Sequence, residues 1–352
     1  MVLGVIWNIT STHICNYIKM KIAKSLGEFR EATQFEGDLN VFFSENYAAY
    51  CSGGALLYVF SENYIIPVVV SEKLVFHWCR FTSEPYEYKE GGESMKLFLN
   101  AVCVFLKKEL KIQWITITPA SSFFSDVPDG SVSVPFGSHV IDLSLDEDKL
   151  FSNIHSKHRN VIKKAEKDGV VIEHGTSEKL IEDYHKIDIQ TWERSSRKAS
   201  GEDSLRGMVN MLKDNIIIYM AYKDGEPQSG AIFFFNKVMC YYMHGANKHN
   251  PLTGSGNLLQ WQAIKDMKAA GVQKYSFVGC RINEDENSKY HGIQRFKERF
   301  GGGLIQGYVF KMILNGFYYH LFGIINGASS LIKHGKVIRQ KDIVDEEIHK
   351  WR

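Results

Sequence analysis

A lysine within an apolar helical stripe is the first residue that could do chemistry. When residues 290–300 are wound at about 100° per residue, Lys297 falls inside a stripe formed by Tyr290, Ile293, Phe296 and Phe300. A buried ammonium needs an anionic partner or a chemical role, because an unpaired charge away from water is costly. These residues alone allow a structural ion pair, a lysine with only its stem buried, or a cation kept for chemistry.

A second group of cations lies on a helix predicted at about 155–168. Its polar side carries Lys157, Arg159, Lys163, Lys164 and Lys167. Only Glu166 and Asp168 oppose them, so the helix forms a positive strip suited to the phosphates of a nucleic acid or of a nucleotide- or lipid-linked molecule. A solvated helix face would look the same. His158, on the apolar side, is interpreted as a satisfied core histidine.

Several segments together resemble the Fem-type aminoacyl transferases, which build peptidoglycan interpeptide bridges from aminoacyl-tRNA. Residues 296–302 resemble the Phe-Lys-x-x-Phe-Gly-Gly signature of that family, and residues 157–171 resemble its basic helix. The other matching segments follow in the family's order at 191–194 (Thr-x-x-Arg), 254–264 and 275–279. The detailed resemblance covers about 140 to 310.

The resemblance implies roles for individual residues. Lys297 would lie near the transferred ester and stabilise negative charge on the intermediate or leaving oxygen. Phe296 would hold the donor end by packing, although a plain core aromatic is an equal interpretation. Arg194 would face the cleft that holds a diphosphate-bearing precursor, because a planar guanidinium pairs well with diphosphate. Arg159, Lys163 and Lys164 would bind phosphates.

The route of the amine's proton is less defined by the sequence. Tyr242, His244 and His291 are possible bases. His244 ends an apolar strand where the sheet of this fold opens, and its side chain has the right pKa range. The amine could also lose its proton to solvent or to the substrate, so a dedicated base is not required.

A short glycine pattern opens a helix predicted at 257–270. Gly254 and Gly256 precede it, and free N–H groups at a helix start bind anions. Coenzyme A-dependent N-acyltransferases of the GNAT superfamily carry Arg or Gln three residues before the first of these glycines, where this chain has Pro251. The pattern therefore favours a donor other than acyl-CoA without excluding it.

Composition limits the remaining classes. The chain has 352 residues, of which 44% are apolar and 23% charged, as expected of a globular protein with two domains. A net charge of +2 means that any polyanion site is local. The six cysteines show no C-x-x-C, which argues against a metal site and a disulfide framework. Together with the poor signal peptide in the first eighteen residues, they predict a cytoplasmic protein.

Residues 312–332 contain no acidic or basic side chain apart from His320. The run would just suffice to cross a bilayer, but its glycines, asparagines and serines make a spanning helix unfavourable. We expect it to pack against the core, with peripheral contact on the inner face of the cell membrane as the alternative.

The order of predicted elements gives an α/β fold with mixed sheets. A hairpin at Asp224–Gly225, further strands and flanking helices are close to the GNAT N-acyltransferase arrangement, and Fem-type enzymes resemble two such units side by side. We therefore expect two tandem GNAT-like domains, one at 1–137, which the segment 311–352 could complete, and one at 138–310. No sustained heptad is present, so no coiled-coil arm is expected.

The sequence thus predicts an aminoacyl transferase that forms an amide bond. It would move an aminoacyl group from aminoacyl-tRNA to an amine of a nucleotide- or lipid-linked cell-envelope precursor of peptidoglycan or polysaccharide, with no cofactor. One alternative keeps the fold but uses acyl-CoA and an amino sugar. The other is a non-catalytic member that only binds tRNA or an envelope component.

Overall fold

The computed structural model describes residues 18–51, 54–118, 124–194, 198–282, 288–334 and 342–350, without the side chains of Lys289, Lys333 and His334. Residues 119–123 lie outside these ranges, as does nearly all of the stretch interpreted as a poor signal peptide (residues 1–17). The chain divides into two compact units. Unit 1 comprises Met1–Gly37, Cys51–Phe136 and Gln306–Arg352, and unit 2 comprises Asp38–Tyr50 and Gly137–Ile305.

The segment Asp38–Tyr50 belongs to unit 2, although its position in the chain led us to group it with the first domain. Contacts made by its aromatic side chains account for this placement. Phe42 lies 4.5 Å from Tyr241 between ring centroids, and Tyr47 lies 6.2 Å from Phe234. The two short helices of the segment, η1 (Val41–Phe43) and α3 (Glu45–Tyr50), therefore complete the core of the second unit.

Unit 1 is a mixed sheet with helices. Its sheet runs in the order β1-β2-β3-β4-β6-β14, with antiparallel pairing except between β4 and β6. The strands are β1 (Lys21–Ala23), β2 (Ala55–Phe60), β3 (Tyr64–Lys73), β4 (Phe76–Phe81), β6 (Trp114–Ile117) and β14 (Gly303–Ile313), and β5 (Tyr86–Glu87) pairs with β3. The helices are α2 (Leu26–Thr33), α4 (Met95–Glu109), α11 (Gly316–His334), α12 (Ile343–Glu347) and η3 (Ile348–Lys350).

Unit 2 repeats this plan. Its strands run in the order β7-β12-β11-β10-β9-β8, and only β11 and β12 are parallel. They are β7 (Val132–Asp142), β8 (Val171–Gly175), β9 (Ile216–Lys223), β10 (Glu226–Phe235), β11 (Met239–Asn247) and β12 (Lys274–Ser276), and β13 (Cys280–Arg281) pairs with β7. The further helices are α5 (Glu147–Asn153), α6 (Ser156–Lys167), α7 (Glu178–Glu193), α8 (Glu202–Leu212), η2 (Lys213–Asn215), α9 (Ser255–Ala269) and α10 (Lys289–Glu298).

The same motif is therefore present twice. In each unit an antiparallel meander is followed by one helix, α4 or α9, and then by a strand parallel to the last strand of the meander. The predicted α/β class with two related units is confirmed. The hairpin at Asp224–Gly225 is also confirmed, since both residues have positive φ, 51° and 79°, as a tight type I′ connection requires.

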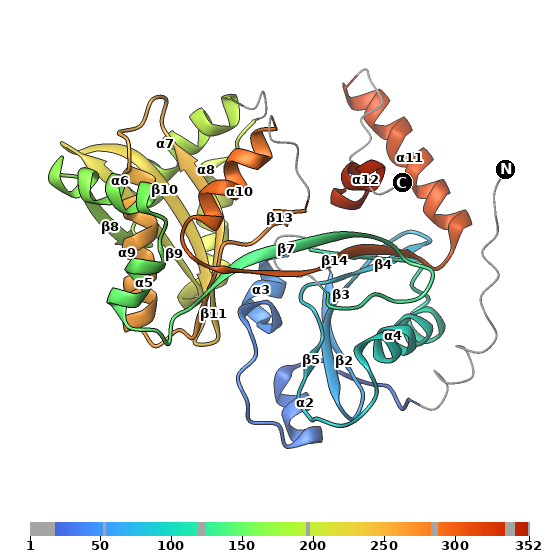
Figure 1. The fold of residues 1–352 in the computed structure, drawn as a ribbon. Helices are drawn as coiled ribbons and strands as arrows, with labels where there is room; N and C mark the ends of the chain where they lie inside the picture. Colours follow the sequence, from blue (N-terminus) through green and yellow to red (C-terminus); the bar gives the residue numbers. More distant parts are fainter. Residues whose placement is uncertain are drawn as a thin grey trace. The chain divides into compact units, whose positions relative to one another are not determined.

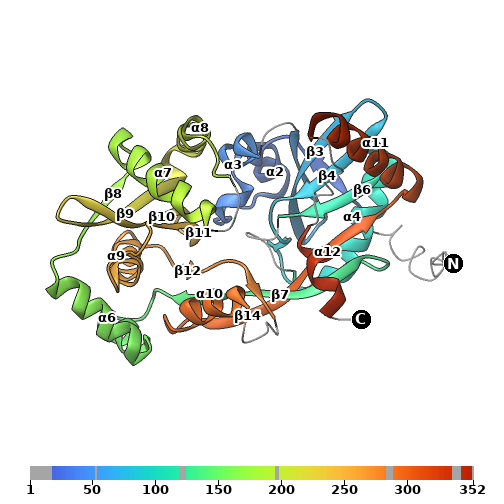
Figure 2. The same ribbon diagram turned by 90° about the horizontal axis from the view of Figure 1, so that it is seen from above.

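Helices cover both faces of the unit 2 sheet, as Figure 2 shows, with α7 and α8 on one side and α6 and α9 on the other. Adjacent residues of β10 consequently point into different layers. The Phe233 ring packs against Tyr219 and Tyr275, whereas the Phe234 ring lies near Tyr47 and Tyr50. This explains the apolar run at 230–235, which makes up the second part of β10 and is mostly buried.

The uncharged run forms most of α11, which directly follows β14 (Figure 1). One side packs on the unit 1 sheet, as expected, because Phe322 lies 5.0 Å from Trp114 and 5.4 Å from Trp78 between ring centroids. Within the described part of the chain, no helix combines the length and apolarity needed to cross a bilayer.

Gly230 provides a test of how α7 packs on the sheet. A Cβ at this position would lie 2.7 Å from Met220 Sδ and 2.8 Å from Tyr184 Cδ2. Gly230→Ala should therefore lower the free energy of unfolding by about 1–3 kcal/mol through overpacking. Gly207→Ala in α8 meets only ordinary contacts and should raise it by about 0.5–1 kcal/mol. Urea denaturation of both variants measures the difference, and equal stabilities would contradict the close packing.

Candidate functional site

The parallel strands β11 and β12 separate at one end. Their pairing runs from Met239 opposite Lys274 to Tyr241 opposite Ser276, where β12 ends, while β11 continues to Asn247. The ladder between the two strands therefore opens beyond Tyr241 and Ser276, within unit 2. The main-chain groups there are not used by the ladder between these strands, so they are available to other partners.

Lys297 occupies the β12 side of this opening. It belongs to α10, is 9% exposed, and donates hydrogen bonds from Nζ to the carbonyls of Val278 at 2.5 Å and Gly279 at 3.0 Å. No carboxylate among the described residues pairs with it. An ammonium has three N–H donors, so one remains for a ligand once these two carbonyls are satisfied.

Burial makes the Lys297 ammonium easier to deprotonate. Desolvation lowers the pKa of Lys297 to about 8, while the neighbouring Cys280 acts weakly in the opposite direction. The side chain is therefore mostly an ammonium at neutral pH but loses its proton well below the usual range of lysine. A donor of this kind can stabilise an oxyanion and can also exchange a proton near physiological pH.

The carbonyls that hold Lys297 come from an unusual turn. Val278 has φ of 37° and Gly279 has φ of 48°, and a β-branched residue in this region is strained. The turn is fixed by its neighbours, since the N–H of Val278 donates to Ser276 Oγ at 3.2 Å and Ser276 Oγ lies 2.8 Å from Ser138 Oγ. The structure thus maintains a strained conformation that turns two carbonyls toward one ammonium.

Three further residues of the Phe-Lys-x-x-Phe-Gly-Gly signature, Phe300, Gly301 and Gly302, determine how α10 packs. Phe300 is buried and lies 5.1 Å from Phe277 between ring centroids. A Cβ at Gly301 would be 2.6 Å from the carbonyl oxygen of Asn153, and one at Gly302 would be 3.0 Å from the backbone of Val140. Both glycines are therefore required for close backbone approach, which anchors the end of the helix that carries Lys297.

The predicted apolar stripe of this helix is correct for Lys297 but wrong for Ile293, which is 48% exposed. The inward contacts are made by Gln294, which donates to the Arg281 carbonyl at 2.5 Å, and one turn later by Lys297. Phe296 is partly buried, 5.2 Å from Phe300 and 5.4 Å from His158 between ring centroids. Its ring is therefore part of the packing around the lysine.

His158 itself corrects the sequence interpretation. It is buried, as expected, but its Nδ1 atom has no hydrogen-bond partner in the structure. Desolvation lowers its pKa to about 4, with Arg299 and His155 contributing in the same direction. His158 is therefore a neutral member of an aromatic cluster, and one of its polar atoms is unsatisfied.

The structure separates Tyr242 from His244. The ring of Tyr242 lies 5.6 Å from Phe233 and 6.1 Å from Phe277, on the side of α6 and α9. A bulge in β11 follows, and His244 is exposed with its ring 6.5 Å from Phe234 on the opposite face. Burial raises the pKa of Tyr242 to about 12, and desolvation lowers the pKa of His244.

Tyr242 is thus the candidate that shares the aromatic cluster next to Lys297. Gly245 makes room for it, because a Cβ there would lie 1.9 Å from the Tyr242 hydroxyl. His291, the third possible base, is partly buried at the start of α10, where its N–H donates to Ser288 Oγ at 3.2 Å. Among the described residues, no hydrogen bond joins either histidine to the Lys297 ammonium.

The basic helix α6 is present, but its cations differ in availability. Arg159 donates from Nη1 to the carbonyls of Ser152 and Ile154, and so fixes the turn between α5 and α6. Lys164 pairs with Asp168 one turn later. Lys163 is exposed with its ammonium 5.8 Å from the Phe151 ring, and Lys157 and Lys167 are exposed without an ion pair in the described structure. The last three are the cations that remain for phosphates.

Arg194 is engaged with the main chain of a loop. It donates to the carbonyls of Asn247 at 2.9 Å and Lys248 at 3.1 Å, and to Thr191 Oγ1 at 3.0 Å. Thr191 Oγ1 in turn accepts from the Asn247 N–H at 2.8 Å. In the described structure the Thr-x-x-Arg segment therefore clamps the chain just after β11, and the predicted diphosphate role remains a prediction.

The two glycines before α9 have different roles. Gly254 has φ of 91°, and a Cβ there would lie 2.2 Å from the Val161 carbonyl oxygen, so it permits α9 to approach α6 closely. Gly256 meets only ordinary contacts. Ser255 points inward, with its Oγ 2.8 Å from Ser229 Oγ. Packing thus accounts for Gly254, while the anion-binding role predicted for both glycines stays open to experiment.

Asp188 on α7 is a polar candidate that the sequence did not indicate. Burial raises its pKa, although a hydrogen bond from Trp192 opposes this. Its neighbour Tyr184 is buried, and desolvation, Asp188 and Tyr242 together raise the pKa of Tyr184 well above its usual value. The helical spacing from Asp188 to Trp192 was visible in the sequence, but only the fold reveals that Tyr184 is buried against Gly230 of β10.

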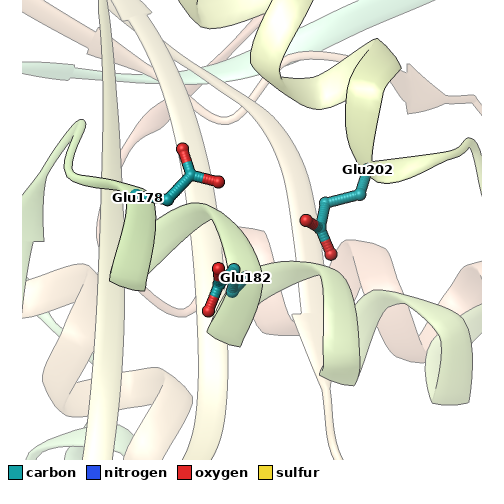
Figure 3. A group of neighbouring side chains, drawn as sticks. All are labelled: Glu178, Glu182 and Glu202. Atoms are coloured by element: carbon teal, nitrogen blue, oxygen red, sulfur yellow. The ribbon is translucent and has the colours of Figure 1, made fainter.

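An acidic group between α7 and α8 is the only cluster of metal-ligand type found among the described residues. Glu178, Glu182 and Glu202 have ligand oxygens within 4.8 Å of one another (Figure 3). Arg206 donates to Glu178 at 2.5 Å and also to Glu202. A guanidinium therefore already neutralises two of the three carboxylates, and the cluster is explained as a surface ion-pair network.

Comparison with known protein families identifies the part of the chain that contains this site. Residues 152–298, which include α6, the β11–β12 opening and Lys297, match the family described as Acetyltransferase (GNAT) domain. This stretch is similar to a GNAT domain. The prediction of an acyltransferase that forms amide bonds is thereby confirmed at the level of enzyme class. Among proteins with curated descriptions, none matches the chain.

Solved structures resemble the whole chain, beyond the GNAT domain. FemX aligns with a TM-score of 0.64 and 14% identity over 86% of this chain and 99% of its own. The C-terminal domain of a putative lysylphosphatidylglycerol synthetase from Agrobacterium fabrum aligns with a TM-score of 0.51 and 13% identity, over 91% of this chain and 97% of its own. L-PGS from Bacillus licheniformis aligns with a TM-score of 0.51 and 11% identity, over 88% of this chain and 95% of its own. At such low identities, structural likeness establishes the fold alone. The expected Fem-type fold is confirmed at that level.

The buried charge in the GNAT domain should be visible in the pH dependence of stability. Because Lys297 has a pKa of about 8 when folded and about 10.4 when unfolded, the unfolded chain binds more protons between these values. Stability should therefore rise with pH across this window, by on the order of 3 kcal/mol from Lys297. Lys297→Met should lack this rise and remain folded at neutral pH. Parallel pH profiles of unfolding free energy would contradict the assignment.

Proposed function

We propose that this acyltransferase moves an aminoacyl group from aminoacyl-tRNA to an amine of a nucleotide- or lipid-linked cell-envelope precursor, without a cofactor. The observation that carries the proposal is the Lys297 ammonium, held by two carbonyls with no carboxylate partner in the described structure. A structural ion pair would neutralise this charge inside the protein. A charge held by carbonyls remains positive and attracts a developing oxyanion.

The same arrangement assigns the other roles. Phe296 and the aromatic cluster would exclude water from the donor ester, which strengthens the attraction between the ammonium and the oxyanion. The exposed lysines of α6 would contact phosphates of the donor or acceptor. Tyr242, His244 and Asp188 are the groups we consider for the amine's proton, with Asp188 added because burial raises its pKa toward that of a useful base.

Two neighbours of the fold support an aminoacyl rather than an acetyl donor. FemX carries the name of the Fem type, and a lysylphosphatidylglycerol synthetase is by its name concerned with a lysylated phospholipid. The match to an acetyltransferase domain keeps acyl-CoA transfer to an amino sugar as the second candidate. A binding protein without activity is the third. Lys297 argues against it, because a buried ammonium with no carboxylate partner among the described residues is costly without a role.

Ligand-dependent stabilisation distinguishes the donors. A stable analogue of the aminoacylated tRNA 3′ end should raise the melting temperature, since binding at a hundred times the dissociation constant adds about 2.7 kcal/mol. Acetyl-CoA at the same concentration should have little effect, because Pro251 replaces the Arg or Gln expected for coenzyme A. A shift with acetyl-CoA alone would favour the second candidate.

Transfer activity tests Lys297 directly. Radiolabelled aminoacyl-tRNAs are incubated with an envelope-precursor fraction and the labelled amide product is measured. Lys297→Met should reduce turnover about 10²–10³-fold, as loss of one oxyanion donor does elsewhere. The exposed Arg295, two residues before Lys297 on the same helix, provides the control, and Arg295→Met should retain activity. Wild-type turnover in Lys297→Met would assign the lysine a purely structural role.

Salt dependence tests the basic helix. If the α6 cations meet phosphates, the logarithm of donor affinity should fall linearly with the logarithm of salt concentration. A double change, Lys163→Gln with Lys167→Gln, should reduce the slope by about 1–2. Lys164→Gln should reduce it less, because Lys164 is already paired with Asp168. If the wild type and both variants show the same dependence of donor affinity on salt, these lysines form only a solvated helix face and do not contact phosphates.

A further inference from the structure

Helix α11 has apolar side chains on two opposite sides. The inner side packs on the unit 1 sheet through Phe322 and Tyr319, whose rings lie 5.0 and 5.8 Å from Trp114. Phe322 also lies 5.1 Å from Phe76 at the start of β4. This side alone would account for an ordinary amphipathic helix with a polar outer face.

The outer side is apolar instead. Phe317 is 71% exposed, Ile324 69% and Ile332 86%, and Leu331 is exposed as well. The stripe follows helical spacing at positions 317, 321, 324, 328 and 331, where it also includes the partly buried Leu321 and the exposed Ala328, and Ile332 adjoins its end. At 1.5 Å per residue the stripe is about 22 Å long. Nothing in the described parts of unit 1 covers it.

A second exposed apolar element lies at the flank of this helix. The turn between β3 and β4 carries Leu74, 88% exposed, and Val75, 56% exposed. The next residue, Phe76, packs against Tyr318 and Phe322 of α11. Gln113 connects the two elements further, since its side chain donates to the Val75 carbonyl and its own carbonyl accepts from the N–H groups of Leu314 and Asn315.

Two exposed lysines and one exposed glutamate lie near this surface. Lys311, the last charged residue before α11, is buried and pairs with Asp342 and Asp345, so it adds nothing to the outer face. Lys73 adjoins the exposed turn, and Lys111 lies two residues before Gln113. Both are exposed. Glu72, the acid on the hairpin, lies 3.8 Å from His77, which offsets it when protonated.

We propose that the outer stripe of α11 and the Leu74–Val75 turn form a membrane-docking surface that inserts into the interface of an anionic bilayer. A helix that lies in the interface needs one apolar face with cations beside it, and protruding aliphatic side chains reach the acyl boundary. A protein partner is disfavoured, because protein interfaces are enriched in aromatic residues and Arg and depleted in Lys. The proposal goes beyond the transfer reaction and holds for any acyl donor.

Vesicle binding tests the surface without any activity measurement. The full chain is sedimented with vesicles of equal parts phosphatidylcholine and phosphatidylglycerol, and with vesicles of phosphatidylcholine alone. Binding is expected to the anionic vesicles and to weaken with salt. Ile324→Gln with Leu331→Gln, and separately Leu74→Ser with Val75→Ser, should each reduce the partition coefficient at least about tenfold. Lys73→Gln with Lys111→Gln should weaken anionic binding alone.

The control is Val171→Gln, which changes an equally exposed aliphatic residue on β8 of unit 2 and should bind as the wild type. Circular dichroism establishes that each variant is folded, so loss of binding is not loss of structure. Absence of binding to either vesicle, or equal binding by all variants, would overturn the proposal. The same holds if sedimentation equilibrium shows that the stripe variants abolish self-association of the chain while vesicle binding is unchanged.

Discussion

The contact on which the site depends is the one between the Lys297 ammonium and the carbonyls of Val278 and Gly279. Each participant is held in an unfavourable state, the lysine by burial and the valine by a positive φ. Separately, a buried cation and two carbonyls directed away from the ladder would both be costly. Together they satisfy each other, so neither the lysine nor the turn is stable in this form without the other.

This contact exists only because two strands separate. A helix between parallel strands, α9 in unit 2, brings β12 beside β11, and the strands part after Tyr241 and Ser276. Unit 1 builds the same strand–helix–strand element from β4, α4 and β6. Unit 2 differs in how α10 is packed. Gly301 and Gly302 let the chain after this helix approach the backbone of Asn153 and Val140 closely, and this packing directs Lys297 toward the turn.

The sequence predicted those features that depend on periodicity and failed where they depend on partners. Helical spacing placed Lys297 inward, but it also placed Ile293 there, since periodicity does not tell which turn of a helix meets its neighbour. The family resemblance suggested Arg194 and Arg159 as phosphate ligands, and their phosphate roles remain predictions. Periodicity and residue type did not reveal that a guanidinium would use the same donors for backbone carbonyls, as both arginines do here. The position of Asp38–Tyr50 was hidden because it rests on aromatic contacts between residues nearly two hundred positions apart.

In the proposed reaction, a cation fixed beside the reacting centre also bears on the need for a base. The attacking amine must be uncharged, and a neighbouring ammonium lowers the pKa of a protonated amine by like-charge repulsion. Once the amine attacks the ester, the oxyanion that forms attracts the same ammonium, so the interaction turns from repulsive in the ground state to favourable in the transition state. Lys297 would therefore promote both loss of the amine's proton and formation of the intermediate. Under this account Tyr242, His244 or Asp188 needs only to carry the proton away.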